Sequence, residues 1–229
     1  MVTIITGSVS VFATDNNFKI NNVLKNYSSN EDYYNIYMAN NEKLIADKFN
    51  KVEEILKNNE LCIETGTTKE KIFNLGDNSK LKITLIDESE DESLIDLTAS
   101  TPGGETLWKD YGNRKFTSHY EVWIGPLYYD LYLVNHYKLS ASGITERYGE
   151  SYMDVSGAAS GSAGNVNISK SSAGIGETVS MNCVFTLTQT TTAQYSKVFK
   201  MYNKVKCSSI DTVDKQVKVV QSWNGEWLS

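Results

Sequence analysis

Residues 115–139 read KFTSHYEVWIGPLYYDLYLVNHYKL, and this stretch decides the fold. Polar and apolar side chains alternate along Lys115–Ile124 and again along Leu127–Leu139, and Gly125-Pro126 separates the two runs. Alternation with a period of two is typical of strands, and two such runs joined by a two-residue break predict a β-hairpin. If Ile124 pairs with Leu127, the apolar side chains of both strands share one face, which we expect to meet the core.

The opposite face of this hairpin carries the candidate binding residues. In the same register it presents Trp123, Tyr128, Tyr132 and His136. Exposed tyrosine and tryptophan offer rigid, amphipathic contact area to proteins and glycans, and the chain contains 14 tyrosines. Ordinary packing on the sheet surface is the alternative role for these aromatic residues.

The register also places Glu121 opposite Asp130, with His119 close to both. Two like charges directly opposite each other destabilise a sheet, so the pair needs a cation, a shared proton or a shifted register. A cation bound by His119, Glu121 and Asp130 is one interpretation. An exposed polar and aromatic face without an ion is the other, and a shift of one residue would separate the three side chains.

Residues 101–229 are expected to form an antiparallel β domain. Several further runs alternate between apolar and polar residues, and the clearest one places Val179, Met181, Cys183, Phe185 and Leu187 on a single face. Polar turns separate these runs, as in a two-sheet sandwich or an open barrel.

The cysteines offer at most one disulfide bond. Of the three, Cys183 and Cys207 fall on the apolar faces of expected strands and form the candidate pair, which leaves Cys62 as a free thiol. The absence of a Cys-x-x-Cys motif and the presence of only two histidines argue against a structural zinc site.

Residues 14–100 are expected to form a helical and mixed acidic region. Ile45, Phe49, Val52, Ile55 and Leu56 recur at helical spacing, which predicts an amphipathic helix within residues 18–60 whose apolar face packs on the core. Leu81–Leu85 alternates like a strand, and the acidic run 87–92 that follows it is interpreted as a solvated loop. Pro102-Gly103-Gly104 marks the expected domain boundary.

Residues 1–13, MVTIITGSVSVFA, resemble a truncated signal peptide. The segment is apolar and uncharged, and small residues occupy the positions that signal peptidase recognises before a cut after Ala13. A short first strand is the alternative. Export would place the mature chain, starting at Thr14, outside the cell or on its surface, with contact to a membrane but no integral span.

Charge and motifs exclude several classes of function. Residues 14–100 carry 10 basic and 17 acidic side chains and residues 101–229 carry 12 and 11, so neither part is basic enough for nucleic-acid binding. The chain lacks a Gly-x-Ser-x-Gly elbow, a phosphate-binding loop and a His-Glu-x-x-His motif. No cofactor is expected, and a non-catalytic protein is favoured over an enzyme.

Two resemblances to known families add to this interpretation. The Val11-Phe12-Ala13 junction, the Asn-, Tyr- and Lys-rich helical region and the β segment from Phe116 to Trp227 resemble uncharacterised exported proteins of Gram-positive bacteria. Gly103-Gly104, Trp108 and Tyr111-Gly112 resemble the start of lactococcin-972-type bacteriocins. The second resemblance implies a small β-sandwich that is released after removal of a signal.

Together these observations predict an α+β protein with an N-terminal helical segment followed by an antiparallel β-sandwich. The expected function is binding of an extracellular protein or glycan through the β domain, without catalysis. A secreted, membrane-active toxin is one alternative, because the alternating strands around Val179–Cys207 could form an amphipathic membrane hairpin. A metal-dependent enzyme that uses the His119, Glu121 and Asp130 face is the other.

Overall fold

The computed structural model describes residues 30–58, 61–63, 68–91, 108–189 and 196–228. The predicted signal peptide lies outside these residues. The described chain contains one helix and thirteen strands, which are α2 (Asn30–Asn58), β1 (Leu61–Ile63), β2 (Thr68–Gly76), β3 (Ser79–Ser89), β4 (Trp108–Asp110), β5 (Gly112–Ile124), β6 (Leu127–Ser140), β7 (Gly143–Gly157), β8 (Ala159–Ala163), β9 (Asn167–Lys170), β10 (Ser172–Ala173), β11 (Thr178–Gln189), β12 (Ser196–Asp211) and β13 (Gln216–Trp227).

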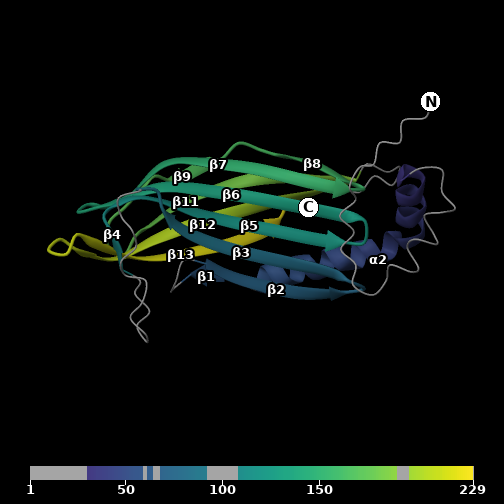
Figure 1. Ribbon diagram of the computed structural model, residues 1–229, viewed down its shortest axis with the longest axis horizontal. Helices are drawn as coiled ribbons and strands as arrows, with labels where there is room; N and C mark the ends of the chain where they lie inside the picture. Colours follow the sequence, from purple (N-terminus) through teal and green to yellow (C-terminus); the bar gives the residue numbers. More distant parts are fainter. Residues whose placement is uncertain (1–29, 59–60, 64–67, 92–107, 190–195, 229) are drawn as a thin grey trace, which may run out of the picture.

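The strands form two antiparallel sheets that extend along the long axis of the molecule (Figure 1). The six-stranded sheet has the order β10-β7-β6-β5-β3-β2. The seven-stranded sheet has the order β1-β13-β12-β11-β8, with β4 also paired to β13 and β9 to β11. The prediction of an N-terminal helix followed by antiparallel sheet is therefore confirmed.

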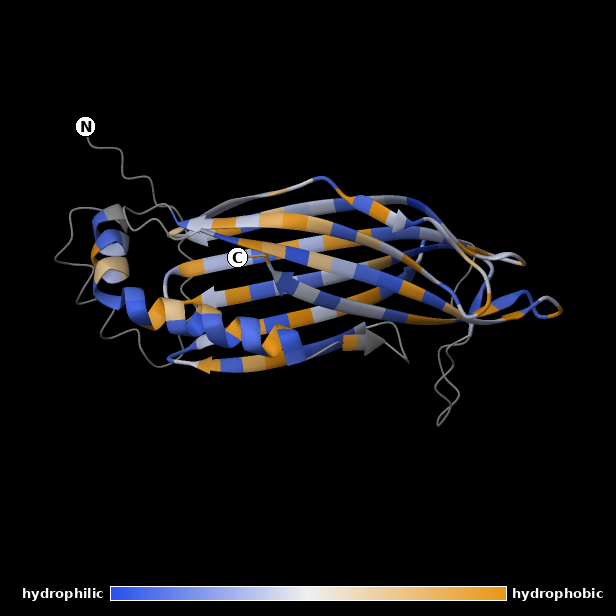
Figure 2. Ribbon diagram, turned by 180° about the vertical axis from the view of Figure 1, so that it is seen from behind, coloured by the Kyte–Doolittle hydropathy of each residue, from blue (hydrophilic) through white to orange (hydrophobic). Residues whose placement is uncertain are grey.

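The predicted hairpin forms in the predicted register. Strands β5 and β6 pair from Gly112 opposite Leu139 to Ile124 opposite Leu127 without a shift, and Glu121 lies opposite Asp130. The alternation between polar and apolar residues appears as bands along the strands (Figure 2). Tyr120 and Leu131 are fully buried, so the apolar face of the hairpin meets the core as expected.

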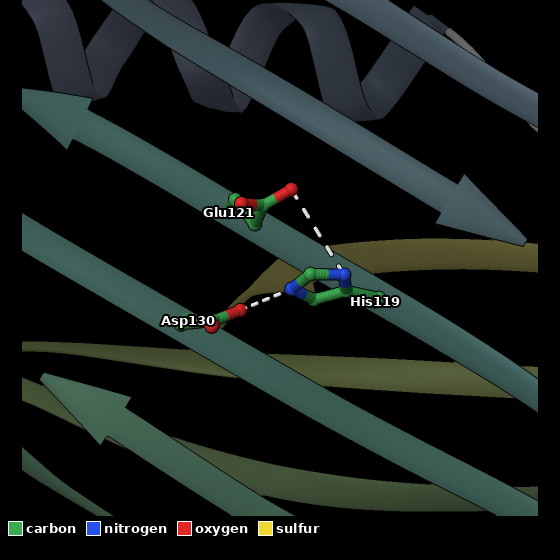
Figure 3. Close-up of side chains that lie close together, drawn as sticks. All are labelled: His119, Glu121 and Asp130. Atoms are coloured by element: carbon green, nitrogen blue, oxygen red, sulfur yellow. Dashed lines mark hydrogen bonds and ion pairs between the residues drawn. The ribbon is translucent and has the colours of Figure 1, made fainter. Parts of the chain in front are cut away.

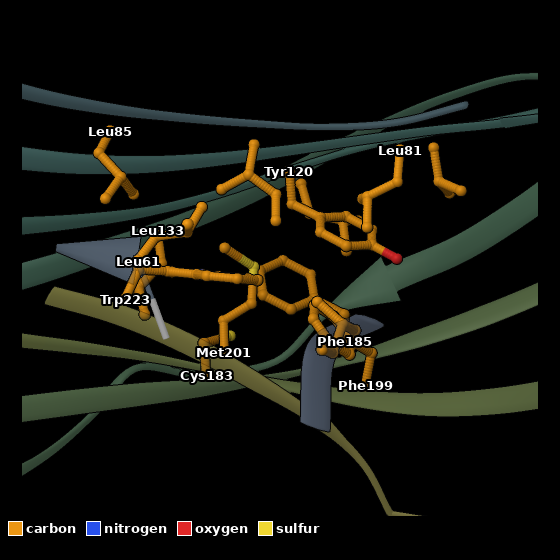
Figure 4. Close-up of a cluster of buried hydrophobic side chains, with 14 of the residues drawn as sticks. Leu61, Leu81, Leu85, Tyr120, Leu133, Cys183, Phe185, Phe199, Met201 and Trp223 are labelled. Carbon is orange, nitrogen blue, oxygen red and sulfur yellow. The ribbon is translucent and has the colours of Figure 1, made fainter. Parts of the chain in front are cut away.

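One hydrophobic core lies between the two sheets (Figure 4). The ring of Tyr120 on β5 lies 4.7 Å from that of Phe199 on β12 and 6.3 Å from that of Trp223 on β13, measured between centroids. All three side chains are fully buried. Removal of such a side chain from water contributes roughly 1.5–3 kcal/mol to stability, so these contacts hold the two sheets together.

Helix α2 packs its predicted apolar face on this core. Ile45, Phe49, Val52 and Leu56 are buried, and the Phe49 ring contacts Tyr129 of one sheet and Trp227 of the other. The helix contacts β13 and β2, which belong to different sheets, and therefore covers one side of the core where the sheets meet. It bends at Asn41, whose backbone is not helical.

The core also contains a polar bridge between the sheets, centred on Asp87. This carboxylate is fully buried and pairs with the Arg114 guanidinium at 2.7 Å and with the Lys109 ammonium at 3.1 Å. The Tyr137 hydroxyl donates to Asp87 and accepts a hydrogen bond from Gln221 on β13. Burial alone would raise the pKa of Asp87, but the charges of Arg114 and Lys109 hold it below its ordinary value.

This bridge corrects the interpretation of residues 87–92 as a solvated loop. Asp87–Ser89 continues β3, and Glu90 binds His136 and Arg147. Strand β3 pairs with β5 along ten residue pairs, so segments from both sides of the expected boundary near residue 102 share one sheet. The expected division at residues 100–101 does not follow the arrangement of the sheets.

The candidate disulfide is also corrected, because Cys183 and Cys207 are buried free thiols. Cys183 lies opposite Met201 on the neighbouring strand, six residues from Cys207. At about 3.3 Å per residue this corresponds to roughly 20 Å along the strand, which is beyond the reach of a disulfide. The two side chains share an apolar face without being neighbours.

The alternating strands around Val179–Cys207 form β11 and β12, which pair with each other inside the seven-stranded sheet. Their apolar side chains, including Val179, Phe185 and Met201, are fully buried in the core. Over the described residues, no helix has the length and apolar character needed to cross a membrane.

The buried bridge predicts a large effect for Arg114→Met. The substitution leaves Asp87 inside the core with Lys109 as its remaining cationic partner, and loss of one partner from a buried pair typically costs about 3–5 kcal/mol. We expect the free energy of unfolding, measured by urea titration, to fall by about 3 kcal/mol. Lys115 lies on the same strand as Arg114 and forms a half-exposed ion pair with Glu88 on β3. Lys115→Met removes this pair and should cost less than about 1 kcal/mol. Equal effects of the two substitutions would contradict this role of the bridge.

Candidate ligand-binding face

The candidate site is the solvent side of the six-stranded sheet over β5, β6 and β7. Side chains that face away from the core are aligned there in rows across the strands, because directly paired residues lie side by side. We call this surface the outer face. It contains the predicted binding residues Trp123, Tyr128 and Tyr132, all of which are partly exposed.

Aromatic side chains form two of these rows. In the first, Trp123 and Tyr128 lie opposite each other with ring centroids 5.1 Å apart. In the second, His119, Tyr132 and Tyr152 form a nearly parallel stack with centroid distances of 4.0 and 4.3 Å. The prediction that these aromatic residues gather on one face is confirmed.

A row of three carboxylates runs between the aromatic rows. Glu121 lies opposite Asp130, which in turn lies opposite Asp154 on β7. His119 is placed between the first two (Figure 3): its Nε2 contacts Asp130, and its Nδ1 lies 3.9 Å from Glu121 Oε2. The Lys82 ammonium is 3.2 Å from the same Glu121 oxygen. Lys82 therefore offsets part of this like charge, and the His119 ring lies between the two carboxylates, without a shift of register.

Asp130 also organises the neighbouring tyrosines. The Tyr132 hydroxyl donates a hydrogen bond to Asp130 Oδ2 at 3.1 Å, and the same carboxylate acts electrostatically on the Tyr128 hydroxyl. Partial burial and the negative charge of Asp130 raise the pKa values of both phenols. Both hydroxyl groups therefore stay protonated and act as hydrogen-bond donors.

The fourth predicted binding residue, His136, lies on the outer face but is not open to a ligand. Its side chain is 8% exposed, contacts Glu90 through Nδ1 at 2.5 Å and stacks on Tyr148 at 4.1 Å between centroids. Glu90 also binds Arg147 at 2.6 Å. These contacts give His136 a structural role at the far end of the face from Trp123.

The three predicted metal ligands come together. Single ligand atoms of His119, Glu121 and Asp130 lie within 4.8 Å of one another, and an imidazole with two carboxylates is a donor set that Zn²⁺ accepts. In the structure, however, the donor atoms already contact one another and Lys82. A metal ion would have to displace these contacts.

Sequence reasoning missed Tyr152 and Asp154, which extend an aromatic row and the carboxylate row onto β7. Every second residue from 148 to 154 is aromatic or acidic, namely Tyr148, Glu150, Tyr152 and Asp154. This alternation is the signal from which a strand could have been predicted. Their neighbours could not be inferred, because the pairing of β6 with β7 shifts at a bulge between His136 and Tyr137.

A buried carboxyl group lies on the inner side of the same strands. Glu146 on β7 is opposite Tyr137, is 7% exposed and accepts a hydrogen bond from the Asn135 amide at 3.1 Å. Burial raises its pKa to about 7. Glu146 therefore takes up a proton near neutral pH next to the polar bridge.

Comparison of the chain with protein-family models, with curated proteins and with solved structures finds no match.

The raised pKa of Glu146 predicts a pH-dependent stability. The folded state holds the proton up to a pH of about 7, whereas the ordinary pKa of an unburied glutamate is 4.5. The stabilisation is therefore complete below pH 4.5 and is lost as the pH rises to about 7. The loss amounts to roughly 3 kcal/mol at about 1.4 kcal/mol per pKa unit.

In urea titrations between pH 4.5 and about 7, the free energy of unfolding of Glu146→Gln should not fall as the pH rises. The variant should also be more stable than the native protein at pH 8. Glu54→Gln on the exposed side of α2 serves as the control and should follow the native protein. An unchanged pH profile for Glu146→Gln would contradict the assignment.

Proposed function

We propose that the protein is an exported, non-catalytic binding protein that holds a glycan on the outer face. In this proposal the two packed sheets form a β-sandwich, and one of its surfaces serves as the binding surface. The observation that carries the proposal is the pair of aromatic rows, Trp123–Tyr128 and His119–Tyr132–Tyr152, on either side of the carboxylates. Aromatic rings pack on the apolar side of a sugar, and carboxylates accept hydrogen bonds from its hydroxyl groups.

The ligand would bind without much rearrangement of this surface. The rings are fixed by stacking and by hydrogen bonds to Asp130, so few rotamers are lost when a ligand binds. They also lie on three long paired strands rather than on loops. Such a rigid, amphipathic surface suits recognition of an extended polymer.

Co-sedimentation of the full chain with cellulose, xylan, chitin, chitosan and purified peptidoglycan tests this proposal. We expect at least one polysaccharide to retain the protein, and the double substitution Tyr128→Ala/Tyr152→Ala to lower the apparent affinity at least tenfold, or about 1.4 kcal/mol. Tyr202→Ala, on the solvent side of β12 in the other sheet, is the matched control. Retention by no polysaccharide, or equal loss in the control, would overturn the proposal.

A metal-dependent enzyme is the second candidate, supported by the convergence of His119, Glu121 and Asp130. Metal analysis by mass spectrometry after incubation with Zn²⁺ and dialysis checks it. This candidate requires about one ion per chain and its loss in Glu121→Ala. Absence of bound metal in the native chain would remove the candidate and leave the binding proposal unaffected.

A further inference from the structure

We propose that the ligand of the outer face is an amino sugar, whose primary ammonium group binds at Asp154, the exposed end of the carboxylate row. This inference rests on the proposed function and adds the chemical class of the ligand. It is based on the charge of the carboxylate row, on the way the chain's own lysines contact this face, and on the position of Tyr152 at the sheet edge.

The carboxylate row carries more negative charge than its neighbours offset. Across β3, β5, β6 and β7 the row contains Lys82, Glu121, Asp130 and Asp154, and Lys82 also binds Glu70 at 2.9 Å. Among the described residues the side chain of Asp154 makes neither a hydrogen bond nor an ion pair, and it is exposed. Like charges on paired residues are unfavourable, so a cationic ligand at the exposed Asp154 would relieve its repulsion with Asp130.

The lysines of the chain show which groups this surface accepts. The Lys80 ammonium lies over the Trp123 ring, 4.2 Å from its centroid, and the Lys82 ammonium contacts Glu121. Both are primary ammonium groups, one bound by an aromatic face and one by a carboxylate. At the β7 end of the row, the exposed Asp154 lies two residues from the exposed Tyr152 on the same face of the strand, which offers the same two kinds of contact to an external ammonium.

An open ring face is available beside this charge. Strand β10 pairs with β7 only at Thr145 and Ile144, so among the described strands of this sheet β7 is the edge at Tyr152. Tyr132 covers one face of the Tyr152 ring, and the residue is 46% exposed. A pyranose ring could pack on the remaining side while its ammonium group reaches Asp154.

The spacing of the carboxylates favours a sugar over a lysine-rich peptide. Paired residues on adjacent strands are separated by about 4.8 Å, whereas side chains on one face of an extended peptide recur at about 6.7 Å. Successive lysines of such a peptide would therefore not follow the row. An amino sugar holds its ring and its ammonium within one compact unit, which matches a carboxylate with an aromatic ring beside it.

Isothermal titration of the full chain with two β-1,4-linked tetramers tests the inference. One tetramer is glucosamine, and the other is N-acetylglucosamine, which has the same rings without the ammonium groups. At mildly acidic pH and physiological salt, we expect the glucosamine tetramer to bind at least tenfold more tightly. Asp154→Asn should weaken this binding about tenfold. Glu150→Gln, which removes one exposed charge from the same face of β7, should change it less than twofold.

Three outcomes would overturn the inference. Equal affinity for the two tetramers would remove the role of the ammonium group but leave glycan binding in place. Equally tight binding of tetralysine would show that the sugar ring is not recognised. Failure of both tetramers to bind would exclude the amino-sugar class, whereas the proposed function is judged independently by co-sedimentation with the neutral polysaccharides.

Discussion

The buried ion pair between Asp87 and Arg114 is the interaction on which the rest of the structure depends. A carboxylate taken out of water is strongly destabilised unless it is paired and hydrogen-bonded, and here Arg114, Lys109 and Tyr137 meet that requirement together. They come from strands of both sheets, and Gln221 adds a further contact from β13. The apolar core alone could accept small shifts of one sheet against the other. The contacts of Lys109 on β4 with Asp87 and of Gln221 on β13 with Tyr137 join the two sheets and oppose such shifts.

The fixed relation between the sheets explains why an ordered polar surface forms on the outside. Alternate residues of the same strands serve the core and the outer face: Tyr120 is buried between the sheets, whereas His119 and Glu121 take part in the outer rows. The inner side chains set the register, and the register determines which outer residues are opposite one another. Three aligned carboxylates with aromatic rings on either side are thus a consequence of core packing as well as a candidate binding surface.

The sequence allowed the β5–β6 hairpin and its outer residues to be predicted because alternation and the Gly125-Pro126 break favour the register that places Ile124, Leu127 and Leu131 together on the core face. The apolar side of α2 was predicted for the same reason. Asp87 was misjudged because it begins an acidic run, and its partner Arg114 is 27 residues away. The pairing of Cys183 with Cys207 failed because alternation gives the face of a residue but not its position along a neighbouring strand. Asp154 was missed because its alignment with Asp130 depends on the bulge in β6 and β7.

The position of β13 in its sheet has a consequence for how the protein reaches its folded state. This strand lies between β12 on one side and β1 and β4 on the other, and it supplies Trp223 to the core. During synthesis or passage through a narrow channel, the seven-stranded sheet cannot assemble and the core cannot close until residues 216–227 have emerged. Closure of the core between the two sheets must therefore wait for this late segment.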